Sequence, residues 1–152
     1  MIMYPLISAL IIIADQITKY MVRSGMQPGD SIPVIGEWLR IYYVRNTGTA
    51  FSMFSGNKMI TIVLTSVLII GCLVYAVKEA RSGSKITALF LTMIASGGLS
   101  NLIDRLTLGY VTDMISCSSF AVFNVADIAV TCGCFLLVIY LLLTMRSEDE
   151  EK

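Results

Sequence analysis

Four long apolar stretches alternate with shorter polar segments along the chain. They cover residues 1–20, 59–77, 86–103 and 126–145, and each is close to the roughly 20 apolar residues that a helix needs to cross a bilayer. This pattern predicts a mainly α-helical integral membrane protein with four transmembrane helices. We expect residues 1–146 to form a single membrane-embedded domain and residues 147–152 to form an acidic tail outside it.

The segment 21–58 has a different pattern. Turn signals at Pro28–Gly29–Asp30 and Gly36–Glu37 separate two short runs, 31–35 and 39–45, that are rich in β-branched and aromatic residues. Trp38 is a residue type that favours the membrane–water interface. The segment therefore predicts a small antiparallel β-sheet lying on one membrane surface.

Basic residues predict the orientation. The connector 78–85 carries three Lys or Arg residues, and short basic loops stay in the cytoplasm. With four spans, this places both termini in the cytoplasm, and it places the segments 21–58 and 104–124 on the extracytoplasmic face.

The amino-acid composition mainly excludes classes of function. The chain is 56% hydrophobic and 14% charged, with mean hydropathy +0.78, and it has 11 basic and 11 acidic residues, so a nucleic-acid partner is not expected. It contains no histidine, which removes Ser-His-Asp catalysis, imidazole-based zinc sites and His-Glu-x-x-His metalloprotease chemistry. The cysteines form no Cys-x-x-Cys pair: Cys72, Cys117, Cys132 and Cys134. We expect neither a metal nor a cofactor.

Two carboxylates stand out between the last two apolar stretches. Asp113 and Asp127 bracket a short polar excursion, and a charged group costs about 2.5–3.5 kcal/mol at the centre of a bilayer and less toward its surface. Two close carboxylates commonly share a proton and act together as acid and base. The simpler interpretation is that one Asp caps a helix and the other lies in a loop.

Further polar residues fall at the same membrane level once the four spans are arranged. Asp15 and Lys19 are four residues apart in the favourable acid-first order for a helix pair. Taken singly, such residues are ordinary boundary charges, turn residues or interhelical hydrogen-bonding groups, and Asp104 with Arg105 would be an interfacial charge pair. Their convergence predicts a polar site: Asp15, Lys19, Asn46, Asn101, Arg105, Asp113, Asn124 and Asp127. Gly48 would add backbone freedom beside Asn46, and the run 96–100 would let another helix approach closely.

These residues lie in five motifs whose order and spacing resemble those of the lipoprotein signal peptidase (signal peptidase II) family. The motifs read D-Q-I-T-K at 15–19, N-T-G-T-A-F-S at 46–52, G-G-L-S-N-L-I-D-R at 97–105, V-T-D-M-I at 111–115 and F-N-V-A-D at 123–127. The resemblance extends over the chain except its acidic tail. It departs from the usual family residues at Thr49, Ser100, Thr112, Met114 and Ile128.

The resemblance implies an aspartic endopeptidase of the bacterial cytoplasmic membrane that removes the signal peptide from diacylglyceryl-modified prolipoproteins, just before the lipidated cysteine. It implies that Asp113 and Asp127 are the catalytic pair. It also implies that the site is shaped by Asp15, Lys19, Asn46, Gly48, Asn101, Arg105 and Asn124. Inhibition by globomycin and contact with membrane lipids follow from the same resemblance, and we expect the protein to act as a monomer.

Two functions of other classes compete with this interpretation. A small transporter or channel also places Asp and Asn in the membrane, but it predicts acidic residues through the membrane depth or an internal repeat. A non-enzymatic membrane adaptor could use the 21–58 sheet as a binding face, and it would not need the Asp113/Asp127 pair.

Overall fold

The computed structural model describes residues 2–48, 58–118 and 121–150. Its helices and strands follow in the order α1 (Met3–Gly25), β1 (Ser31–Ile35), β2 (Leu39–Asn46), α2 (Lys58–Ser82), α3 (Lys85–Thr107), β3 (Val111–Cys117) and α4 (Val125–Glu150). All four helices are long and apolar enough to span a membrane. The chain is therefore a multi-pass membrane protein.

Helix α3 lies at the centre of the bundle. In its membrane-spanning window 56% of the residues are buried, against 11% in α1 and α4 and 17% in α2. The α1, α2 and α4 helices all pack against α3. Small residues permit the closest approach: a Cβ added at Gly97 of α3 would lie 2.4 Å from the carbonyl oxygen of Ala126 in α4. This contact fixes the first turn of α4 one helical turn away from Asn101.

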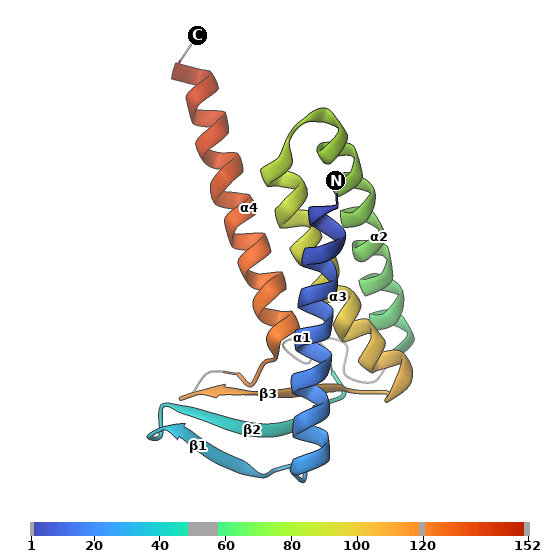
Figure 1. Cartoon of the computed structure of the whole chain (residues 1–152), viewed down its shortest axis with the longest axis vertical. Coiled ribbons are helices and arrows are strands. Elements are labelled where there is room, and N and C mark those ends of the chain that lie inside the picture. The colour runs from blue at the N-terminus through green and yellow to red at the C-terminus, as the bar shows by residue number, and fades with distance from the viewer. Residues whose placement is uncertain (1, 49–57, 119–120, 151–152) are drawn as a thin grey trace.

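A three-stranded antiparallel sheet, in the order β1-β2-β3, lies across one end of the helices. The α2–α3 turn lies at the opposite end (Figure 1). The β2–β3 register pairs Val44 with Asp113 and shifts between Ile41 and Val44. Because diagonal neighbours on one sheet face lie within reach of each other, Asn46 can contact Asp113 from the next position on that face.

The chain turns back on itself after β3. Phe123 forms an isolated antiparallel bridge with Ile115, donating its N–H to the Ile115 carbonyl at 3.0 Å and accepting the Ile115 N–H at 2.8 Å. This pairing sets Asn124 beside β3 immediately before α4 begins.

The four spans and the first two strands are confirmed, with corrections to their ends. Helix α1 continues to Gly25, beyond the expected end at residue 20, and α2 continues through Ser82. The expected 78–85 connector is therefore reduced to Gly83 and Ser84. Helix α4 continues to Glu150, so most of the expected tail at 147–152 is helical. The third strand, β3, was not predicted.

Candidate active site

Two asparagines hold the Asp113 carboxylate. The Asn124 side-chain amide donates to Asp113 Oδ1 at 2.7 Å, and the Asn46 amide donates to Asp113 Oδ2 at 2.9 Å. Asp113 is 2% exposed and Asn124 is fully buried. Each carboxylate oxygen therefore has a fixed donor, one from the end of β2 and one from the entry to α4.

Asp127 is hydrogen-bonded to Asn101 of α3. The Asn101 Nδ2 donates to Asp127 Oδ1 at 2.8 Å, while its Oδ1 accepts hydrogen bonds from Lys19 Nζ at 2.8 Å and from Asn124 Nδ2 at 3.1 Å. The ammonium requires the amide oxygen and the carboxylate requires the amide nitrogen. The neighbours thus dictate which way the Asn101 amide faces, and they join the two Asp residues through two asparagines.

Asp15 ties the first helix to the last. It forms a 2.6 Å ion pair with Lys19, and both side chains are fully buried. Its other oxygen accepts the backbone N–H of Ala126 at 2.8 Å, so it satisfies an otherwise free donor at the positive N-terminal end of α4. The hydroxyl of Ser100, one of the departures from the family residues, donates to Asp15 at 2.7 Å.

Asp104 belongs to the same network, which the sequence interpretation missed. Its carboxylate lies 3.5 Å from Lys19 and 3.8 Å from Arg23, and it accepts the Thr112 backbone N–H at 3.0 Å and the Gln16 amide at 3.1 Å. The prediction that Asp104 pairs mainly with Arg105 is therefore wrong, because the ion pairs of Asp104 are with Lys19 and Arg23 of α1. Since Thr112 precedes Asp113, this carboxylate anchors β3.

Arg105 lies at the edge of the cluster. The negative charges of Asp127 and Asp113 act on its guanidinium. It also lines a small cavity with Asn46, Thr61 and Tyr110. Its volume is about 20 Å³, which is room for about one water molecule, and it lies next to the Asn46 side chain that donates to Asp113.

Burial dominates the electrostatics of Asp113. The pKa of this carboxyl is raised from an ordinary value of 3.8 to about 6. Removal from water is the main cause and the nearby charge of Asp127 adds to it, while the Asn46 and Asn124 hydrogen bonds and Lys19 oppose the rise. Near pH 6 this carboxyl therefore exchanges readily between its acid and base forms, as a group that transfers protons must.

The predicted site residues converge on one region of the molecule, between the sheet and the adjacent ends of α1, α3 and α4. Gly48 is near it through its backbone, because its N–H donates to Asn46 Oδ1 at 3.0 Å. Gly48 does not have a positive φ, since the positive-φ glycines of the described chain are Gly29, Gly36, Gly83 and Gly109. The rest of that motif, 49–52, lies outside the described residues.

Each additional residue of the network is adjacent in sequence to a predicted site residue. These additional residues are Gln16, Ser100, Asp104 and Thr112. Within the described ranges, no group of three or more His, Cys, Asp or Glu is arranged to hold a metal ion.

The fold and this cluster define a class: a four-helix membrane protein with buried polar groups and two linked carboxylates beneath a surface sheet. Comparison with known proteins gives the family. Residues 7–143 match the model of the family described as signal peptidase (SPase) II. The chain belongs to the signal peptidase II family, and the transporter interpretation is not favoured.

Individual relatives agree over nearly the full chain. The chain is 36% identical to a lipoprotein signal peptidase of Moorella thermoacetica, over 96% of this chain and 97% of that protein. It is 32% identical to one of Staphylococcus aureus, over 97% and 92%. Two solved bacterial membrane enzyme structures superpose with TM-scores of 0.88 and 0.84 at 32% and 33% identity, covering 94% and 92% of this chain and 89% and 92% of theirs.

Proposed function

We propose that this peptidase is an aspartic endopeptidase in which Asp113 and Asp127 are the catalytic pair. The observation that carries the proposal is the continuous hydrogen-bonded path from Asp113 through Asn124 and Asn101 to Asp127. A purely structural pair of carboxylates would not need to be joined in this way.

The chemistry follows from the pair. Two neighbouring carboxylates resist ionising together, so one retains a proton. The ionised member takes a proton from a water molecule as it attacks the scissile carbonyl, and the protonated member donates to the carbonyl oxygen. When the C–N bond then breaks, the proton taken from the water passes to the leaving amine, and the hydroxyl formed from the carbonyl oxygen returns its proton to the other carboxylate. Because the pair titrates as a unit, we assign the base and acid roles to the pair and not to either residue.

The surrounding residues keep the pair in position. Asn46, Asn101 and Asn124 donate to carboxylate oxygens, and Lys19 supplies a buried positive charge that Asp15 and Asp104 balance. Arg105, at the mouth of the small cavity, is placed to orient substrate. Gly48 acts through its backbone N–H on Asn46.

The substrate we propose is a diacylglyceryl-modified prolipoprotein, cut just before the lipidated cysteine. The names of the relatives, lipoprotein signal peptidases, support this substrate class. The peptide would lie along the surface sheet while its acyl chains stay in the bilayer. A globomycin-type inhibitor would occupy the same site as the substrate peptide.

We further propose a placement in the cell. Residues 1–146 would form one domain of the bacterial cytoplasmic membrane, acting as a monomer, with both termini cytoplasmic and the site on the extracytoplasmic face. The basic residues of the α2–α3 end, opposite the sheet, support this orientation.

The decisive experiment is a gel-shift assay of purified protein on a diacylglyceryl-modified prolipoprotein. Wild type should shorten the substrate, whereas Asp113→Asn and Asp127→Asn should each lower the rate by more than about 1,000-fold, since the reaction requires both members. Asp30→Asn makes the same chemical change at an exposed turn carboxylate and should cleave normally. Circular dichroism would establish that all variants are folded. Near-normal cleavage by either dyad variant would refute the paired mechanism.

A further inference from the structure

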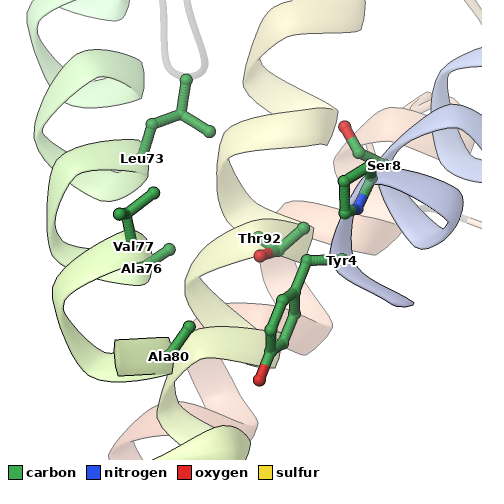
Figure 2. A pocket seen from close by; sticks show the side chains of 8 residues that line it. Tyr4, Ser8, Leu73, Ala76, Val77, Ala80 and Thr92 are labelled. Atoms are coloured by element: carbon green, nitrogen blue, oxygen red, sulfur yellow. The ribbon is translucent and has the colours of Figure 1, made fainter. Parts of the chain in front are cut away.

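A hollow separate from the polar site lies toward the other end of the bundle. Its volume is about 250 Å³, and it is formed by α1 and α2 over α3. Figure 2 shows Leu73, Ala76, Val77 and Ala80 from α2 facing Tyr4 and Ser8 of α1, with Thr92 of α3 between them. From residue 73 to residue 80 the hollow runs about 10 Å along α2.

The few polar groups in this hollow are satisfied by the protein itself. The Thr92 hydroxyl donates to the Ala88 carbonyl at 2.7 Å, and the Ser8 and Ser96 hydroxyls are hydrogen-bonded to each other at 2.8 Å. The Tyr4 hydroxyl donates to the Lys85 carbonyl at 3.4 Å. The surface presented to an occupant is therefore hydrocarbon, which favours an acyl chain over water or a polar ligand.

A second, shallower hollow is lined by residues of α2 alone and borders the first along a ridge formed by Leu73 and Val77. Leu73 and Val77 line both hollows, and the second also contains Val74, Lys78 and Arg81. Two apolar hollows separated by one ridge, with two cations at one end, match a lipid with two acyl chains and a negative headgroup.

The cations are available to such a headgroup. Lys78 and Arg81 are exposed, and the ion pairs found within the described residues do not include either of them. Lys78 lies 5.5 Å from the centre of the Tyr75 ring, which holds the ammonium near the apolar surface. Glu79, between them in sequence, is half-buried.

We propose that this surface binds one anionic glycerophospholipid, with its phosphate at Lys78 and Arg81 and its two acyl chains on either side of the Leu73–Val77 ridge. The positive charges of Lys78 and Arg81 favour an anionic lipid over a signal peptide, which is the other apolar chain that the protein would meet. A signal peptide carries its own positive charges beside its apolar region, and these would be repelled by the two cations.

Native mass spectrometry of the detergent-solubilised protein tests the proposal by titration with dioleoyl phosphatidylglycerol and dioleoyl phosphatidylcholine. The first phosphatidylglycerol should bind more than tenfold tighter than phosphatidylcholine. Because a basic residue near a membrane surface contributes about 1 kcal/mol, Lys78→Gln and Arg81→Gln should each weaken phosphatidylglycerol binding about fivefold. Binding of phosphatidylcholine should be unchanged.

Two further variants distinguish a defined lipid-binding site from non-specific attraction of anionic lipid to basic residues. Lys85→Gln removes one positive charge at the same end of the bundle, just after the α2–α3 turn. Because the Lys85 side chain lines neither hollow, this variant should change binding less than twofold. Ala80→Leu fills the first hollow with both cations intact, and it should weaken both lipids. Equal effects of Lys85→Gln and Arg81→Gln, equal affinity for the two lipids, or unchanged binding by Ala80→Leu would each overturn the proposal.

Discussion

Asn124 and Asp127 cap each other across the first turn of α4. The Asp127 N–H donates to Asn124 Oδ1 at 2.9 Å, and the Asn124 N–H donates to Asp127 Oδ2 at 3.2 Å. This reciprocal arrangement is a capping box. Asp127 takes part in capping, but the residue that caps the helix is Asn124, and Asp113 lies in strand β3, so the simpler interpretation of a capping Asp and a loop Asp is wrong for Asp113. The Asn124 side-chain nitrogen remains available to hold Asp113.

The two roles of Asn124 can be separated by substitution. Asn124→Ser keeps a capping oxygen and removes the buried amide donor to Asp113, so we expect a loss of about 1–3 kcal/mol of unfolding free energy and at least tenfold slower prolipoprotein cleavage. Asn124→Ala removes the cap as well and should lose about 1 kcal/mol more. Thermal unfolding and cleavage rates of both variants provide the measurements. Full activity of the serine variant would show that Asn124 matters only as a cap.

Asp113 is expected to destabilise the fold above pH 6. Its pKa is raised from 3.8 to about 6, mainly by burial, so the folded state binds this proton more tightly than the unfolded state. Its contribution is favourable below pH 4 and is lost as the pH rises through 6, a change of about 3 kcal/mol. After the loss of one hydrogen bond, worth about 1 kcal/mol, Asp113→Asn should stabilise the protein by about 1–2 kcal/mol at pH 7.5.

At pH 4 the stabilisation by Asp113→Asn should vanish, because the wild-type carboxyl is then protonated and, like the amide of the variant, uncharged. Thermal unfolding of Asp113→Asn and wild type at both pH values is the measurement, with Asp30→Asn as the exposed control. A stabilisation of equal size at pH 4 and pH 7.5 would contradict the assignment of the effect to ionisation.

Asp104 should contribute more to stability than any exposed ion pair. Asp104→Ala leaves Lys19, which is fully buried, with one carboxylate fewer and leaves the Thr112 N–H without its acceptor. The expected loss is about 3–5 kcal/mol of unfolding free energy. Glu37→Ala breaks the exposed pair with Arg40, where Glu37 is 89% exposed, and should cost less than about 1 kcal/mol. Comparable losses in the two variants would argue against a buried anchor at Asp104.

Gly97 and Gly71 form a matched pair of helix glycines. A Cβ at Gly97 would meet the Ala126 carbonyl at 2.4 Å, whereas a Cβ at Gly71 meets nothing within 4 Å. We expect Gly97→Ala to separate α3 from α4, to lose about 1–3 kcal/mol of stability and to slow cleavage, because Asn101 and Asp127 move apart. Gly71→Ala should be neutral or slightly stabilising. If both variants keep wild-type stability and rate, the α3–α4 contact is not limiting.

The sequence predicts the four helices well because spanning a bilayer imposes a long apolar run that few other structures share. It does not predict β3. Thr112 and Asp113 interrupt the apolar alternation, and the strand depends on pairing with β2, more than 60 residues earlier. Long-range pairing of this kind leaves no local pattern.

The polar cluster could be predicted as a region but not as a network. Adjacency in sequence suggests a charge pair between Asp104 and Arg105, yet consecutive residues on a helix do not face each other. The partners of Asp104 lie on α1, at Gln16, Lys19 and Arg23. Only the packing angle of α1 against α3 determines these contacts, and a single sequence does not reveal it.

The bond from Asp15 to Ala126 has a consequence for synthesis. The two residues are 111 positions apart, so the ribosome completes nearly the whole chain before the first helix meets the helix that it caps. Until then the charges of Asp15 and Lys19 can neutralise each other within α1, because the two residues are one turn apart and form an ion pair. A nascent chain that stops short of α4 therefore lacks both the cap and one of the two proposed catalytic carboxylates. Peptidase competence should arise in a single late step, when the last helix docks.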